Sequence, residues 1–148
     1  MNETQASEAS PTELAPLRDR RLRILAIPIL ALIFAEALFG SSLASEGSSY
    51  SPEYLAAHVG VAAVLCALAL FSVIYAFLRF GWRTRTAAGL TAVAVVGATL
   101  AGTVFYFGGQ SGAALNGMES LTGVALIGAI LLILWGSAPA KIPATPSA

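Results

Sequence analysis

The chain is short of charge, histidine and cysteine, and each shortage excludes a class of protein or site. Only 11% of its 148 residues are charged, against 57% hydrophobic, and the net charge is zero. Nucleic-acid binding depends on a basic surface, so we expect no nucleic-acid partner. A lone cysteine, Cys66, excludes an internal disulfide. A lone histidine, His58, excludes a histidine cluster.

The motifs of soluble enzymes are also missing. The sequence holds no glycine-rich phosphate loop and no cysteine pair. Residues 1–17 and 137–148 are polar, small and proline-containing, and such segments cannot bury enough apolar surface to fold, so we expect disordered cytoplasmic tails there. Residues 18–136 remain as one membrane domain, and the sequence favours a non-catalytic protein.

What the chain does contain is four long apolar runs. They are Ile24–Ala44, Tyr54–Leu78, Thr86–Phe107 and Met118–Trp135. A helix needs about 20 mostly apolar residues to cross about 30 Å of hydrocarbon, and backbone groups that meet no water must pair within the helix. Short connections make consecutive helices antiparallel. The predicted fold is therefore all-α, a four-helix transmembrane bundle in up-down-up-down order.

Lysine and arginine predict how this bundle is oriented. They occur only in residues 18–23, in residues 79–85 and at Lys141. The other two connections, residues 45–53 and 108–117, contain neither. Because basic connections stay on the cytoplasmic side, both termini are predicted to be cytoplasmic in a multi-pass protein of the cell membrane.

The first apolar run has one alternative interpretation, a signal peptide cleaved before Ser45, which would leave three spans. The run is long for a signal core and Glu36 interrupts it, so we favour four spans. In the third run, Ala94, Ala98 and Gly102 recur every four residues, and this spacing predicts that the helix packs closely against its neighbours. Tyr106, like other aromatic residues near the run ends, is predicted to lie at a membrane interface.

Two ionisable side chains interrupt the apolar runs, and both lie in the outer halves. At 1.5 Å per residue, Glu36 lies about 12 Å below the outer end of its run and His58 about 6 Å below the end of the next. A carboxylate in lipid is costly and should face the bundle with a partner, so we expect Glu36 to meet His58. Met118 and Glu119 begin the fourth run at the same level, which makes Glu36, His58 and Glu119 a predicted intramembrane polar site.

Three roles fit these residues. His58 and Met118 could be the two axial ligands of a heme iron. His58 and the two glutamates could hold a metal ion, or Glu36 and His58 could pass protons or bind a quinone. Plainer roles exist for Met118 as a packing residue and for Glu119 as an acidic residue in the first turn of a helix.

The segment Leu55-Ala56-Ala57-His58-Val59-Gly60, which opens the second run, resembles the histidine-bearing helices of small heme-binding four-helix bundles. Cytochrome b561-like proteins and each half of heme A synthase are such bundles, and the chain is also similar in outline to other small four-span membrane proteins. The resemblance implies a heme b held by His58. Those bundles pair two histidines, so here Met118 would have to supply the second ligand; without it, the resemblance leaves a bundle that binds no cofactor.

These observations predict a small integral membrane subunit or accessory component of an energy-conversion complex of respiratory type, with an outer-facing polar site. The expected partners are the lipid bilayer and either other subunits of that complex or further copies of the chain. One alternative is a membrane redox protein that binds heme or a metal through His58. Another is an oligomeric ion or proton pathway through Glu36.

Overall fold

The computed structural model describes residues 20–46, 52–109 and 111–136. The predicted disordered tails, 1–17 and 137–148, lie outside the described residues. Within these residues the chain forms four helices, which are α1 (Arg21–Glu46), α2 (Pro52–Arg79), α3 (Trp82–Phe107) and α4 (Gly112–Trp135). Each helix is long and apolar enough to cross a membrane. The prediction of an all-α protein with four potential spans is therefore confirmed.

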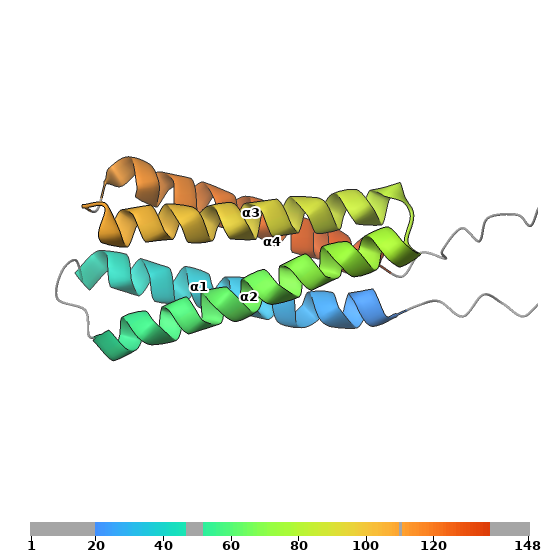
Figure 1. Cartoon of the computed structure of the whole chain (residues 1–148), viewed down its shortest axis with the longest axis horizontal. Helices are drawn as coiled ribbons and strands as arrows, with labels where there is room; N and C mark the ends of the chain where they lie inside the picture. The colour runs from blue at the N-terminus through green and yellow to red at the C-terminus, as the bar shows by residue number, and fades with distance from the viewer. Residues whose placement is uncertain (1–19, 47–51, 110, 137–148) are drawn as a thin grey trace, which may run out of the picture.

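The four helices lie side by side in one bundle (Figure 1). Helix α1 packs on α2 and α4, and α3 packs on the same two helices. In the described part of the chain, the diagonal pairs α1–α3 and α2–α4 do not touch. Figure 1 shows the last residues of α1 and α3 and the first residues of α2 and α4 at one end of the bundle, and the α2–α3 turn at the other. We call the first end the acidic end and the second the basic end, after the charged residues described below.

Large apolar side chains cover the outside of the bundle, whereas small residues fill much of its inside. On α3, the buried positions are mostly alanine and threonine, while Val93, Leu100 and Val104 are exposed. Lipid tails are as apolar as leucine, so helices in a membrane gain from close contact between small residues rather than from hiding large ones. Near the basic end the interior is filled more fully, by a cluster that includes Leu22, Phe80 and Leu132.

The closest approach between helices is that of α3 and α4. A Cβ atom added at Gly128 would lie 2.5 Å from Oγ1 and 3.0 Å from the backbone nitrogen of Thr91, so only glycine fits there. Thr91 is buried and its hydroxyl donates to the carbonyl oxygen of Ala87 at 2.8 Å, which satisfies the hydroxyl inside its own helix. Helix α3 thus packs closely on α4, but at Thr91 and not at a residue of the predicted row Ala94, Ala98 and Gly102.

All four helices begin before the predicted apolar runs do, and the difference is largest for α3 and α4. Helix α3 starts at Trp82 rather than Thr86, and α4 starts at Gly112 rather than Met118. The reason for the second difference is local: Gly109 turns the chain with a positive φ of 97°, and Ser111 caps α4 by accepting a hydrogen bond from the backbone nitrogen of Ala114 at 3.2 Å. Asn116 and the glycines Gly112 and Gly117 lower the hydropathy after this cap without ending the helix.

This earlier start corrects one interpretation. Glu119 lies about two turns past the beginning of α4, and the first turn of α4 holds no acidic residue. The suggestion that Glu119 is an acidic residue in the first turn is therefore wrong, and Met118 does not begin the fourth helix.

Substitution of Gly128 by alanine should lower the free energy of unfolding by about 1–3 kcal/mol, because the added methyl group overpacks the contact with Thr91. Gly123→Ala is the matched control on the same helix, since a Cβ there meets nothing within 4 Å. Thermal unfolding in mild detergent, followed by circular dichroism, measures both. Equal stability of the two variants would contradict the close approach.

Candidate functional site

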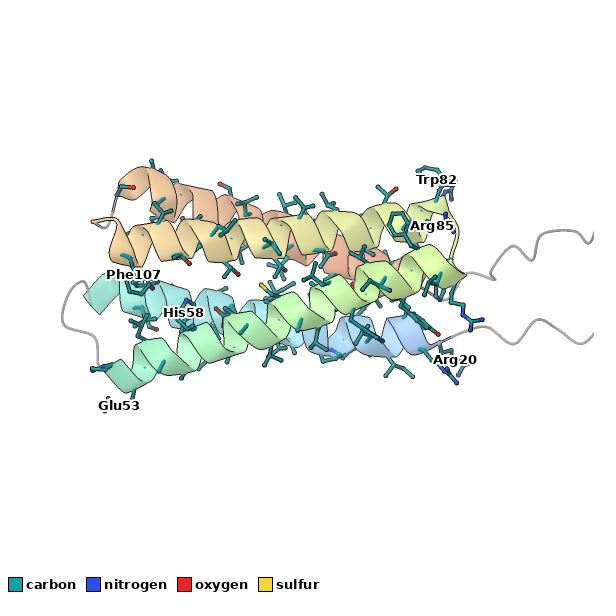
Figure 2. All side chains as sticks on the ribbon, in the orientation of Figure 1. Arg20, Glu53, His58, Trp82, Arg85 and Phe107 are labelled. Atoms are coloured by element: carbon teal, nitrogen blue, oxygen red, sulfur yellow. The ribbon has the colours of Figure 1, made fainter. Side chains whose placement is uncertain are left out.

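The central feature of the site is an ion pair between α1 and α2 inside the bundle. Nδ1 of His58 lies 2.8 Å from Oε2 of Glu36, and the two side chains are only 11% and 13% exposed, respectively. Figure 2 shows His58 within the bundle toward the end that carries Glu53 and Phe107. The contact that the depths along the two helices predict is thus present in the structure.

The pair is close in distance but incompletely bonded. Although Nδ1 and Oε2 are 2.8 Å apart, Nδ1 of His58 makes no regular hydrogen bond to a described residue. Oε1 of Glu36 is buried and receives no hydrogen bond from the described residues. A carboxylate at the centre of a membrane helix costs about 3 kcal/mol, so one short contact offsets only part of that cost. A buried oxygen in this state could accept a further donor.

The second ring nitrogen of His58 is left available. Nδ1 faces Glu36, and Nε2 takes part in no hydrogen bond or ion pair within the described ranges. A histidine that ligates a metal usually has its other ring nitrogen fixed by a carboxylate or carbonyl. The Glu36 contact therefore orients the imidazole in the manner of a ligand or of a proton-exchanging group.

Small residues allow other side chains to reach this pair. A Cβ at Gly40 would lie 3.7 Å from Cε1 of His58 and 3.7 Å from Cε of Met118, so both side chains reach the same glycine of α1. At Gly102, a Cβ would lie 3.2 Å from Sδ of Met118. The ring of Tyr106 meets that of His58 edge to face, with centroids 6.0 Å apart. His58 and Met118 thus meet at Gly40, and Tyr106 packs against the ring of His58.

A cavity of about 500 Å³ opens beside these residues, with walls from all four helices. Its polar wall includes Glu36, His58, Tyr106 and Glu119, and most of the remaining lining is apolar. Toward the middle of the bundle it ends at residues of the buried core, which are Ile33, Leu65, Val95 and Ala125. The cavity therefore occupies the acidic half of the bundle and does not pass through it.

The predicted site residues share this cavity, but they do not all meet. Met118 lies against the glycines of α1 and α3. Glu119 lines the cavity from an exposed position on α4, and the structure gives it no contact with Glu36 or His58. In the described ranges, no three histidine, cysteine or acidic side chains are grouped so as to hold a metal ion. The suggestion of a metal held by His58 and two glutamates therefore lacks its ligand set.

The sequence did not single out Tyr106, Gly40 or Gly102 as residues of the site. Tyr106 was assigned to a membrane interface, whereas its hydroxyl oxygen is buried and its ring packs on His58. A four-residue spacing of small residues through Gly102 was visible, but spacing alone does not show which side chain fills the space. Cys66, in turn, is half-buried with Sγ 3.4 Å from Oγ1 of Thr99, as expected for a packing thiol.

Comparison with known proteins finds no relative of this chain. No protein-family model matches the chain, and neither a curated protein nor a solved structure matches it. The chemistry of the site must therefore be argued from its own residues.

If the pair is stabilising, Glu36→Gln and His58→Gln should be coupled. Interactions of polar side chains between membrane helices contribute about 0.6–1.7 kcal/mol, and we expect a coupling free energy in that range. Unfolding in mixed detergent micelles of the two single variants and the double variant measures it. The control cycle combines His58→Gln with Glu119→Gln, which should be additive. Additive effects in the first cycle would show that the ion pair does not contribute to stability.

Proposed function

We propose that this protein is a small accessory component of a membrane energy-conversion complex, and that its cavity binds a mostly apolar molecule with one polar group. The observation that carries the proposal is the buried pair of Glu36 and His58 on the wall of a cavity of about 500 Å³ that is otherwise mainly apolar. Pockets of about 300–1,000 Å³ with few polar groups are typical of sites for small molecules.

The two side chains suit a ligand that exchanges protons. Imidazole is a common proton donor and acceptor in proteins. The adjacent carboxylate can take a proton from the imidazole and return it. A quinone has the matching chemistry, because its ring and tail are apolar and its oxygens gain or lose protons on reduction or oxidation. A quinone of the bilayer is therefore the ligand class that the cavity supports best.

Heme is the second candidate, and one observation favours it. Nε2 of His58 has no hydrogen-bond partner in the described chain, while Nδ1 lies 2.8 Å from a carboxylate oxygen of Glu36; a ligating histidine usually has a carboxylate or carbonyl beside its other ring nitrogen. Met118 reaches the same glycine as His58 and is the residue that would complete an axial pair. Bound there, heme would supply one-electron transfer, and the protein would supply the ligands and an apolar surrounding.

An ion or proton pathway through a single copy has less support. Beyond the cavity, the basic half of the bundle is filled by apolar side chains such as Leu22, Phe80 and Leu132, all at most 3% exposed. A pathway would therefore have to run between copies.

The orientation in the membrane is part of the same proposal. Figure 2 shows Arg20, Trp82 and Arg85 at one end of the bundle and Glu53 and Phe107 at the other. The rule that basic connections remain cytoplasmic supports an up-down-up-down topology in the cell membrane with both termini inside. The cavity then lies in the outer half of the bilayer, next to other subunits or further copies.

The topology predicts which connections an impermeant thiol reagent can reach. In a Cys66→Ala background, Ser49→Cys and Gly112→Cys should be labelled in intact cells, and Arg83→Cys should be labelled only after the cells are opened. Gel shift after maleimide treatment measures the labelling. Labelling of Arg83→Cys in intact cells would reverse the orientation.

Filling the cavity should abolish binding of a quinone. Ala62 lines the cavity, whereas Ala67 on the same helix is exposed and does not, so Ala62→Phe and Ala67→Phe are a matched pair. We expect Ala62→Phe to weaken binding of decylubiquinone by at least about tenfold, which corresponds to about 1.4 kcal/mol, and Ala67→Phe to leave it unchanged. Equilibrium dialysis with the detergent-solubilised protein measures the affinity. Unchanged binding in Ala62→Phe would place the quinone elsewhere.

The absorption spectrum of the same preparation distinguishes heme from quinone. A heme held by His58 and Met118 should give a reduced-minus-oxidised difference spectrum that His58→Ala removes and that Met118→Leu converts to a high-spin form. Protein purified from its native membrane without absorption in the heme region would exclude this candidate.

A further inference from the structure

A second hollow lies at the opposite end of the bundle, on its outer surface. This open groove runs beside α2 and α3 and is lined by Phe77, Trp82, Arg85, Thr86, Gly89, Leu90 and Val93. Arg85, Gly89 and Val93 follow one another at four-residue intervals, so they form a row along one face of α3, two turns long. The groove thus runs along the outside of the bundle, from the charged Arg85 near the start of α3 to apolar residues nearer the middle of that helix.

Arg85 is placed to bind an anion at the head of this groove. Its guanidinium lies over the ring of Phe77 at 5.5 Å from the ring centroid, which holds the side chain across from α3 to α2. The structure gives Arg85 no acidic partner within its described ranges. The described acidic residues belong to α1, α2 and α4 and begin at or beyond Glu36, and none lines the groove.

The lower part of the groove suits an acyl chain. Leu90 and Val93 are exposed, and a Cβ at Gly89 would meet nothing within 4 Å, so the missing side chain leaves open apolar space between them. Trp82, 71% exposed, stands at the entrance beside Arg85, and exposed tryptophan is typical of the level of lipid headgroups. A cation above a narrow apolar strip is complementary to a phospholipid and not to a free ion.

We propose that this groove, which we call the α2–α3 groove, binds one anionic phospholipid of the leaflet at the basic end. Its phosphate lies at Arg85, and one acyl chain follows Gly89 and Val93. Basic residues near a membrane surface attract anionic lipid with about 1 kcal/mol each. The contact with Phe77 holds the guanidinium of Arg85 at the groove, so the attraction acts at one place on the surface. This inference is independent of the cavity and its ligand.

The test uses the full-length protein in mild detergent with added palmitoyl-oleoyl phosphatidylglycerol, or phosphatidylcholine with the same chains. Native mass spectrometry measures the fraction of protein that retains one lipid. We expect phosphatidylglycerol to be retained over phosphatidylcholine, and Arg85→Gln to weaken that retention about fivefold, the factor that corresponds to about 1 kcal/mol. Arg79→Gln is the control, because Arg79 is exposed at the same end and does not line the groove.

The variant Gly89→Leu distinguishes lipid binding in the groove from a general attraction of anionic lipid to the basic residues. Its Cβ has no other atom of the protein within 4 Å, its side chain extends into the groove, and every arginine stays in place, so it should also reduce retention of phosphatidylglycerol. Circular dichroism establishes that each variant is folded. Equal losses in Arg79→Gln and Arg85→Gln, full retention in Gly89→Leu, or complete competition by inorganic phosphate at equal concentration would each overturn the proposal.

Discussion

The structure depends on one constraint: hydrocarbon offers no water to a polar group, so every such group inside the bundle needs a partner from the protein. Backbone groups meet it by forming helices of 24 to 28 residues. Threonine hydroxyls meet it within their own helix, as Thr91 and Thr99 do by donating to carbonyls four residues earlier. The carboxylate of Glu36 has no such partner within its own helix. Its contact with His58 joins α1 to α2 at this point along the bundle.

The size of the interior side chains then divides the bundle into two halves. Toward the basic end, Phe80 and Leu132 fill the space between helices whose small residues, such as Gly128, allow close approach. Toward the acidic end, the side chains of His58 and Met118 lie against Gly40 and Gly102, and a cavity of about 500 Å³ remains beside them. A close-packed half thus holds the helices rigidly while the other half keeps an opening beside the ion pair.

The two proposed sites use opposite charge chemistry at opposite ends. In the cavity, a carboxylate and an imidazole are buried beside each other, and both are groups that can exchange protons with a ligand. In the α2–α3 groove, Arg85 is exposed and permanently charged, and it offers attraction without proton exchange. An anionic lipid at the groove would anchor the closely packed end and would leave the cavity open to ligands that arrive from the other half of the bilayer.

The sequence by itself determined the helical class and the four possible spans, because both follow from apolar run length, which needs no knowledge of neighbours. It also placed Glu36 and His58 at similar depths. It misplaced the start of α4, since hydropathy does not register the cap at Ser111. Only the tertiary structure decided which helix faces meet, because small residues recur on several faces and spacing does not select among them. The faces that meet place Tyr106 against His58, keep Glu119 away from the contact between Glu36 and His58, and leave the cavity between the helices.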